Sequence, residues 1–237
     1  MKNAAMSPVA TIIITPRDRY TGLEECIDCV YRHTREPFQL WILDLGYPPR
    51  VMEAVRKRLQ HRPEARIFEL GLRAPMDALR EVQHLANTPA VVLLDNDSRV
   101  TEGWLPPLLK AMHDGHAVVT PLILEREGVD RGAPLRNHLY TGELRVVDVE
   151  GTPYLIEHKH FRRTGVPDIP QERAATGTFE LHCVLFQGDV FRSIELPSMV
   201  IREHLDISLQ VAAMGRTMVV EPASVVHFDN RGTRMAL

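Results

Sequence analysis

The chain has 237 residues, of which 44% are hydrophobic and 25% charged; this composition excludes a disordered protein and suits one large α/β domain or two small ones. Its formal net charge of −3 gives no general attraction to nucleic acid, so we expect no nucleic-acid partner. No apolar run approaches the ~20 residues of a membrane span, and residues 1–8 lack the apolar core of a signal peptide, so we expect no transmembrane segment and a cytoplasmic location.

Short apolar runs alternate with amphipathic segments through the first part of the chain. This alternation is typical of a doubly wound α/β sheet, which places its ligands at the carboxyl ends of the strands. Three polar positions follow such strand ends: Asp44, Asp95 and the loop after Ile14. The predicted strands are 9–14, 38–43, 65–69 and 90–94, and the predicted helices are 21–33, 49–60 and 76–87.

Two of the three cysteines, Cys26 and Cys29, form a C-x-x-C spacing within the first predicted helix. Such a spacing can be a redox motif or half of a zinc site. The chain contains no second cysteine pair, and positions i and i+3 lie on one helix face. We therefore interpret both as small buried side chains.

The second half of the sequence has a different character. Residues 120–171 are rich in Arg, Pro, Gly and His, and the runs 144–149 and 154–156 predict short antiparallel strands. The stretch 162–175 has little hydrophobic periodicity and is interpreted as a loop. Further elements are expected as a strand at 179–186, a helix at 205–214 ended by Gly215, and strands at 217–220 and 224–228.

The strongest chemical signal is the pair Asp95 and Asp97 in the run Leu93-Leu94-Asp95-Asn96-Asp97. Two carboxylates at the mouth of a buried strand repel each other unless a cation lies between them. Mg²⁺ and Mn²⁺ prefer oxygen ligands and phosphate, so either ion would account for the pair. Taken alone, the pair could equally be a turn and helix-cap cluster.

The surrounding sequence resembles family 2 glycosyltransferases with the GT-A fold. The carboxylate pair is followed by Gly103-Trp104-Leu105, as in that family, and residues 12–16 resemble its opening strand and nucleotide loop. Residues 38–44 are similar to its second strand, 202–210 to its acidic motif at a helix start, and 219–227 to a strand pair that ends in a histidine. The resemblance spans about 9–228.

The resemblance implies a fold and a division of labour. We expect a Rossmann-like mixed sheet flanked by helices, the GT-A fold of nucleotide-diphospho-sugar transferases. The chain would be a single domain over 1–237, with a nucleotide-binding half at 9–115 and an acceptor-binding half at 116–237. The implied activity is hexosyltransferase-like: metal-dependent transfer of a sugar from a UDP- or GDP-sugar to an unknown hydroxyl acceptor.

The resemblance also implies roles for individual residues. Asp97 would bind Mn²⁺ or Mg²⁺, Asp95 would contact the ribose or orient the metal, and His227 would complete the coordination sphere. Two alternatives stay open: Asp44 could cap the next turn, and His227 could be a hydrogen-bonded core histidine. The nucleotide would be held by Thr15, Pro16, Arg17 and Asp44.

The acidic motif departs from the family pattern, because His204 stands where an aspartate usually acts as the base. Histidine can serve as a base near neutral pH, with Glu203 as the alternative, and Asp206 completes the motif. Glu203 and Asp206 could also be first-turn acids favoured by the helix dipole. The stereochemical outcome is therefore left open.

The acceptor side is expected around the predicted strand 179–186. Glu180 and His182 alternate on one face and would point into an acceptor pocket, with Cys183 directed into the core. Arg162, Arg163 and Arg173 could close over the diphosphate or form an ordinary charged loop. Arg80 could approach the phosphates, but we interpret it as a solvated helix residue.

A competing hypothesis is a sugar-nucleotide-binding module without catalysis, which the unusual base position keeps open. A nucleotidyltransferase and a dinucleotide dehydrogenase both lack support. The segment 15–19 contains no glycine, and no G-x-G-x-x-G follows any predicted strand.

Overall fold

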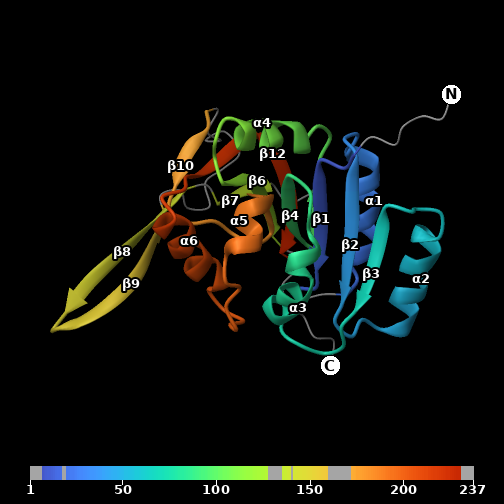
Figure 1. The fold of residues 1–237 in the computed structure, drawn as a ribbon, viewed down its shortest axis with the longest axis horizontal. Coiled ribbons are helices and arrows are strands. Elements are labelled where there is room, and N and C mark those ends of the chain that lie inside the picture. The colour runs from blue at the N-terminus through green and yellow to red at the C-terminus, as the bar shows by residue number, and fades with distance from the viewer. Residues whose placement is uncertain (1–6, 18–19, 128–134, 140, 160–171, 231–237) are drawn as a thin grey trace.

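The computed structural model describes residues 7–17, 20–127, 135–139, 141–159 and 172–230. Its centre is a mixed sheet, ten-stranded over these ranges, with the order β3-β2-β1-β4-β11-β6-β12-β10, while β5 pairs with β12 and β7 with β6. The expected α/β architecture is therefore present (Figure 1). The strands are β1 Ala10–Thr15, β2 Phe38–Asp44, β3 Ala65–Glu69, β4 Ala90–Asp95, β5 Ser98–Val100, β6 Val118–Glu127, β7 Leu135–Leu139, β10 Ala174–Thr176, β11 Cys183–Gln187 and β12 Met218–Asn230.

Alternation of side chains along the central strands explains why helices cover both sheet faces. Ile12 and Ile14 belong to one hydrophobic cluster, whereas Ile13 belongs to the other, as the two-residue period of a strand requires. The first cluster packs against α1 Leu23–His33, α2 Pro49–Leu59 and α4 Leu105–His113. The second packs against α3 Pro75–Val82, the short 3₁₀ helix η1 Gln83–Leu85, α5 Gly188–Ser193 and α6 Glu203–Ala213.

The strands β1, β2, β3 and β4 are parallel to one another, as predicted. Thr15 at the end of β1 pairs in register with Asp95 at the end of β4. Because parallel strands end at one edge of the sheet, this register brings the polar residues after β1 and β4 together. None of the helices in the described ranges combines the length and apolarity needed to cross a bilayer.

Several element boundaries differ from the prediction. The predicted helix 76–87 ends at Val82 and continues as η1, a tightening that is common at helix ends. The predicted strand 179–186 begins only at Cys183, because the preceding segment turns and Gly177 donates its N–H to the Gly142 carbonyl (2.6 Å). The two strands expected near the C-terminus form one strand, β12, whose register shifts between Glu221 and Val225. Pro222 lies in this shift and has no N–H for the ladder.

A two-stranded ribbon projects from the body of the protein (Figure 1). It consists of β8 Gly142–Val149 and β9 Thr152–Lys159, paired antiparallel as predicted. Glu150 (φ 53°) and Gly151 (φ 80°) join the strands, which is the two-residue turn with positive φ that hairpins favour. The base of the ribbon, near Glu157, lies beside the N-terminal end of α6 because Glu157 approaches His204.

The C-x-x-C pair is part of the core. Cys26 and Cys29 are buried on the inner face of α1, and the Cys26 thiol donates to the Asp95 carbonyl at 3.7 Å. Burial raises the pKa of both thiols. The interpretation as small buried side chains accounts for this environment, and a low-pKa redox pair does not.

We expect all three cysteines to resist a thiol reagent in the native protein. Cys26, Cys29 and Cys183 are buried and reduced, and a thiol with a raised pKa supplies little of the reactive thiolate. Absorbance titration with Ellman's reagent should show rapid reaction only after denaturant is added. Fast labelling of one or two thiols without denaturant would contradict this environment.

Candidate metal and nucleotide site

Two aspartates and a histidine converge at the carboxyl end of β4. Asp95, Asp97 and His182 each offer a ligand atom, and these atoms lie within 4.8 Å of one another. Both aspartates are 2% exposed, and Nδ1 of His182 lies 3.1 Å from Oδ2 of Asp95. Two carboxylates and an imidazole form a donor set that can hold a divalent cation.

His182 was predicted to contact the acceptor, but it lies beside the two aspartates. The antiparallel strand β11 is paired with β4, and Asp95 donates its N–H to the His182 carbonyl at 3.1 Å. Burial favours the neutral imidazole, but the hydrogen bond and charge of Asp95, together with Glu180 and Asp97, outweigh it and raise the pKa of His182. The ring of Phe228 stacks on His182 with centroids 4.0 Å apart.

Asn96, between the two aspartates, fixes the loop by hydrogen bonds. Its side-chain N–H donates to the Tyr47 hydroxyl at 2.9 Å, and its Oδ1 accepts the Arg17 N–H at 3.0 Å. Its own N–H donates to the Thr15 carbonyl at 3.0 Å. The sequence did not indicate roles for Asn96 and Tyr47. The full burial of the Asn96 amide inside an acidic turn indicates a structural role, and this burial is known only from the fold.

Gly22 allows helix α1 to approach this loop closely. A Cβ at Gly22 would lie 2.7 Å from the Asn96 carbonyl oxygen and 2.9 Å from Cα of Asp97. These contacts are to backbone, which cannot rotate away. The start of α1 therefore supports the loop that carries the two carboxylates, and only a residue without a side chain fits there.

The predicted nucleotide residues fall into two places. The Thr15 hydroxyl donates to Oδ1 of Asp95 at 3.4 Å, and Nε of Arg17 lies 3.5 Å from Oδ2 of Asp95; Pro16 stands between them at the end of β1. Asp44 instead accepts the N–H groups of Gly46 and Tyr47, both at 3.0 Å. It caps a turn, the alternative that the sequence left open.

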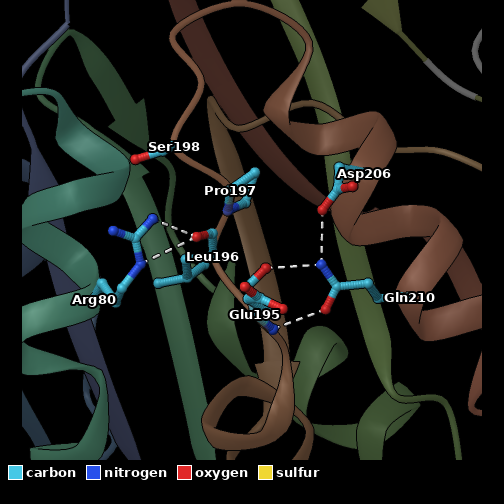
Figure 2. A pocket seen from close by; sticks show the side chains of 7 residues that line it. All are labelled: Arg80, Glu195, Leu196, Pro197, Ser198, Asp206 and Gln210. Carbon is cyan, nitrogen blue, oxygen red and sulfur yellow. Dashed lines mark hydrogen bonds between the residues drawn. The ribbon is translucent and has the colours of Figure 1, made fainter.

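The three residues of the acidic motif have different surroundings. Glu203 is 3% exposed and forms an ion pair with Arg17 at 3.1 Å. Asp206 accepts a hydrogen bond from Gln210 at 2.7 Å and lines a separate pocket of about 770 Å³ (Figure 2). His204 belongs to a second group of side chains.

Glu157, Glu180 and His204 form this second group, with ligand atoms that also lie within 4.8 Å of one another. Nε2 of His204 is 3.7 Å from Oε1 of Glu157, and Lys159 forms an ion pair with Glu180. Burial acts to raise the pKa of Glu180, but Lys159 and the two nearby histidines outweigh it and lower that pKa. Because Glu180 interacts with both His182 and His204, it links the two groups.

Figure 2 also shows that Arg80 is not simply a solvated helix residue. Its Nε and Nη2 donate to the Leu196 carbonyl at 3.2 and 2.5 Å, which ties α3 to the segment before α6. Arg173 pairs with Asp114 and Glu221, each at 2.9 Å. Arg162 and Arg163 lie outside the described residues.

His227 lies on β12, paired in register with Arg99 on β5. It does not belong to the group of Asp95, Asp97 and His182. The neighbouring residue Phe228 stacks on His182, and adjacent strand residues point to opposite faces. A metal-binding role for His227 stays a prediction.

Both the sequence and the fold of this chain are similar to those of known proteins. The family profile described as Glycosyl transferase family 2 matches residues 11–173. Among curated proteins, no sequence matches the chain significantly.

Three solved structures are similar to this chain over nearly its whole length. GalNAc-T7, crystallised with UDP, GalNAc and Mn²⁺, matches with a TM-score of 0.70 at 13% identity, over 98% of this chain and 45% of its own. The mannosyltransferase PcManGT from Pyrobaculum calidifontis, in complex with GDP-Man and Mn²⁺, gives 0.65 at 15% identity, with coverages of 96% and 58%. TarS from S. aureus, in complex with UDP-GlcNAc, gives 0.63 at 13% identity, with coverages of 95% and 59%.

The chain thus spans about half the length of each of these three proteins. At these identities the likeness shows the fold, which is the GT-A fold that the sequence predicted.

Proposed function

The chain belongs to glycosyl transferase family 2, and on that premise we propose that it transfers a sugar from a UDP- or GDP-sugar to a hydroxyl acceptor with the help of a divalent metal. The observation that carries the proposal is the convergence of Asp95, Asp97 and His182 within 4.8 Å at the end of β4. Such strand ends are where open α/β sheets bind their ligands. The Mn²⁺ complexes of GalNAc-T7 and PcManGT support the same chemistry.

The donor set favours Mn²⁺ over Mg²⁺. Asp95 and Asp97 supply carboxylate oxygens, which both ions accept, whereas His182 supplies a nitrogen that Mg²⁺ rarely takes. A bound Mn²⁺ would neutralise charge on the diphosphate leaving group. We assign His182 to the metal rather than to the acceptor, and we keep His227 as a further candidate ligand.

We propose that Arg17 and Thr15 hold the donor. Thr15 ends β1, and Pro16 and Arg17 follow it beside Asp95. A diphosphate on the metal would therefore lie near the Arg17 guanidinium, whose planar donors suit phosphate. Asp44, at the end of β2, caps its turn through Oδ1, and we propose that its other carboxylate oxygen faces the base or ribose.

Among the acidic-motif residues, His204 is the best candidate for the base. Glu203 is neutralised by Arg17, and Asp206 faces the separate pocket with Gln210 (Figure 2). His204 instead lies next to Glu180, which we propose as an acceptor-binding residue. An imidazole there can accept the proton of the acceptor hydroxyl.

The proposal is tested with purified protein and a panel of UDP-GlcNAc, UDP-GalNAc and GDP-mannose. Released UDP or GDP is measured with Mn²⁺ and with EDTA, and binding of UDP and GDP is measured by calorimetry. We expect one donor to be hydrolysed slowly, with turnover lost in EDTA. Binding of nucleotide without turnover of any donor would favour the non-catalytic module. Absence of binding in Mn²⁺ would reject both functions.

A further inference from the structure

The projecting ribbon contributes a carboxylate to the acceptor side of the site. Glu157 lies on β9, 47 positions before His204 on α6, yet the two side chains meet. Each is 13% exposed, and Nε2 of His204 is 3.7 Å from Oε1 of Glu157. This distance is too long for a hydrogen bond but suits an ion pair with a protonated imidazole.

Surrounding contacts hold both partners in place. The Thr178 hydroxyl donates to Oε1 of Glu157 at 3.0 Å, and Nζ of Lys159 lies 3.8 Å from Oε2. The ring of Phe179 meets the His204 ring edge-on with centroids 6.5 Å apart. Nε2 of His204 is buried and has no hydrogen-bond partner among the described residues. Oε1 of Glu157, at 3.7 Å, is therefore the acceptor toward which an N–H at this position would point.

Glu157 is ionised at neutral pH. Burial acts to raise its pKa, but the interactions with His204, Lys159 and Thr178 outweigh burial, and the pKa is lowered. A carboxylate beside a histidine orients the imidazole for proton transfer, as in other carboxylate–histidine pairs.

We propose that Glu157 is the positioning residue of the His204 base, so that this one side chain of β9 serves catalysis through His204; this inference rests on the proposed function. In the reaction the acceptor O–H gives its proton to the His204 imidazole, and the acceptor oxygen forms a bond to the anomeric carbon. The bond from that carbon to the diphosphate oxygen breaks, and its electron pair leaves with the nucleoside diphosphate. Glu157 keeps its charge throughout and acts only through His204.

The test is a double-mutant cycle between Glu157→Gln and His204→Ala, measured with the donor of the panel that turns over. Because general bases contribute about 10²–10⁴-fold to rate, we expect Glu157→Gln to lower kcat about tenfold to hundredfold. The KM for the donor and the calorimetric affinity for UDP or GDP should not change. In the His204→Ala background the same substitution should have no further effect, because its partner is gone.

Two additional variants separate positioning from folding. Thr178→Val removes the hydroxyl that fixes Glu157, and we expect a smaller fall in kcat that also disappears in the His204→Ala background. Glu143→Gln removes an exposed carboxylate on the other strand of the ribbon, where it pairs with Arg145, and should keep wild-type kcat. These variants keep the proposal testable even where Glu157→Gln folds poorly.

The outcomes are distinguishable. Wild-type kcat in Glu157→Gln, or an equal fractional loss in the presence and absence of His204, would overturn the role of Glu157 and leave the proposed function standing. Absence of turnover in the wild-type protein would overturn the proposed function and this inference with it.

Discussion

Replacing Asp97 by asparagine is expected to lower the kcat/KM of metal-dependent turnover by about 10²–10³-fold, the size of effect seen when a major electrostatic contribution is removed. The substitution keeps the volume of a side chain that is only 2% exposed, so packing should survive. It removes one of the two carboxylate charges that attract the cation, and an amide oxygen is a much weaker ligand for Mn²⁺. The measurement is nucleoside diphosphate release across a Mn²⁺ titration.

Thermal unfolding gives an independent measurement of the same role. A ligand at 100 times its Kd stabilises the native state by about 2.7 kcal/mol, which corresponds to roughly 5–10 °C in Tm for a chain of this size. Wild-type protein should show such a rise when Mn²⁺ is added, and Asp97→Asn should show little. The control is Asp28→Asn, an exposed carboxylate of α1 that pairs with Arg58. Full activity and an undiminished Mn²⁺ shift in Asp97→Asn would exclude the metal role of Asp97.

The parallel half of the sheet could be predicted from the sequence because its signals are local. Each of its central strands is a short apolar run, and β1 and β4 are buried on every residue. Asp95 and Asp97 directly follow such a run, so their place at the sheet edge follows from chain order alone. The sequence Gly103-Trp104-Leu105 follows these aspartates. It strengthened the resemblance to family 2 glycosyltransferases, from which the GT-A fold was predicted.

The remaining part of the site depends on contacts between distant segments, which local patterns do not encode. His182 reaches Asp95 only because the antiparallel strand β11 pairs with β4 rather than with a neighbour in sequence. Glu157 reaches His204 only because the ribbon folds back onto α6. The prediction that Glu180 and His182 lie within a strand was wrong, since β11 begins only at Cys183, after both residues. Cys183 does point into the core, as predicted, and is fully buried.

The position of His227 on β12 shows how strongly the direction of a side chain depends on strand register. A one-residue change of position along a strand turns a side chain to the opposite face. Phe228 stacks on His182, so the order of residues on β12 sets which of its side chains share a face with this contact. The metal role of His227 stays a prediction, and the Mn²⁺ titration of a His227→Ala variant tests it.

Gly22→Ala is expected to damage the site from outside it. Gly22 has φ −81°, which alanine adopts freely, so any effect must come from contact rather than from backbone conformation. The added Cβ would meet the Asn96 carbonyl and Cα of Asp97 at 2.7 and 2.9 Å. Overpacking of this kind costs about 1–3 kcal/mol in stability, and a displacement approaching 1 Å at a reacting centre can lower the rate by about 10²-fold.

Gly188→Ala is the matched control, because it creates a comparable clash away from the site. Its Cβ would lie 2.2 Å from the Thr88 carbonyl oxygen and 3.1 Å from that of Pro89, at the opposite end of β4 from Asp95. Both variants should unfold at a lower denaturant concentration than wild type. Only Gly22→Ala should also weaken Mn²⁺ binding and lower kcat per folded molecule, since only it moves the loop of Asp97. Equal losses of Mn²⁺ affinity in the two variants would show that general destabilisation, and not the support of α1 for this loop, governs the site.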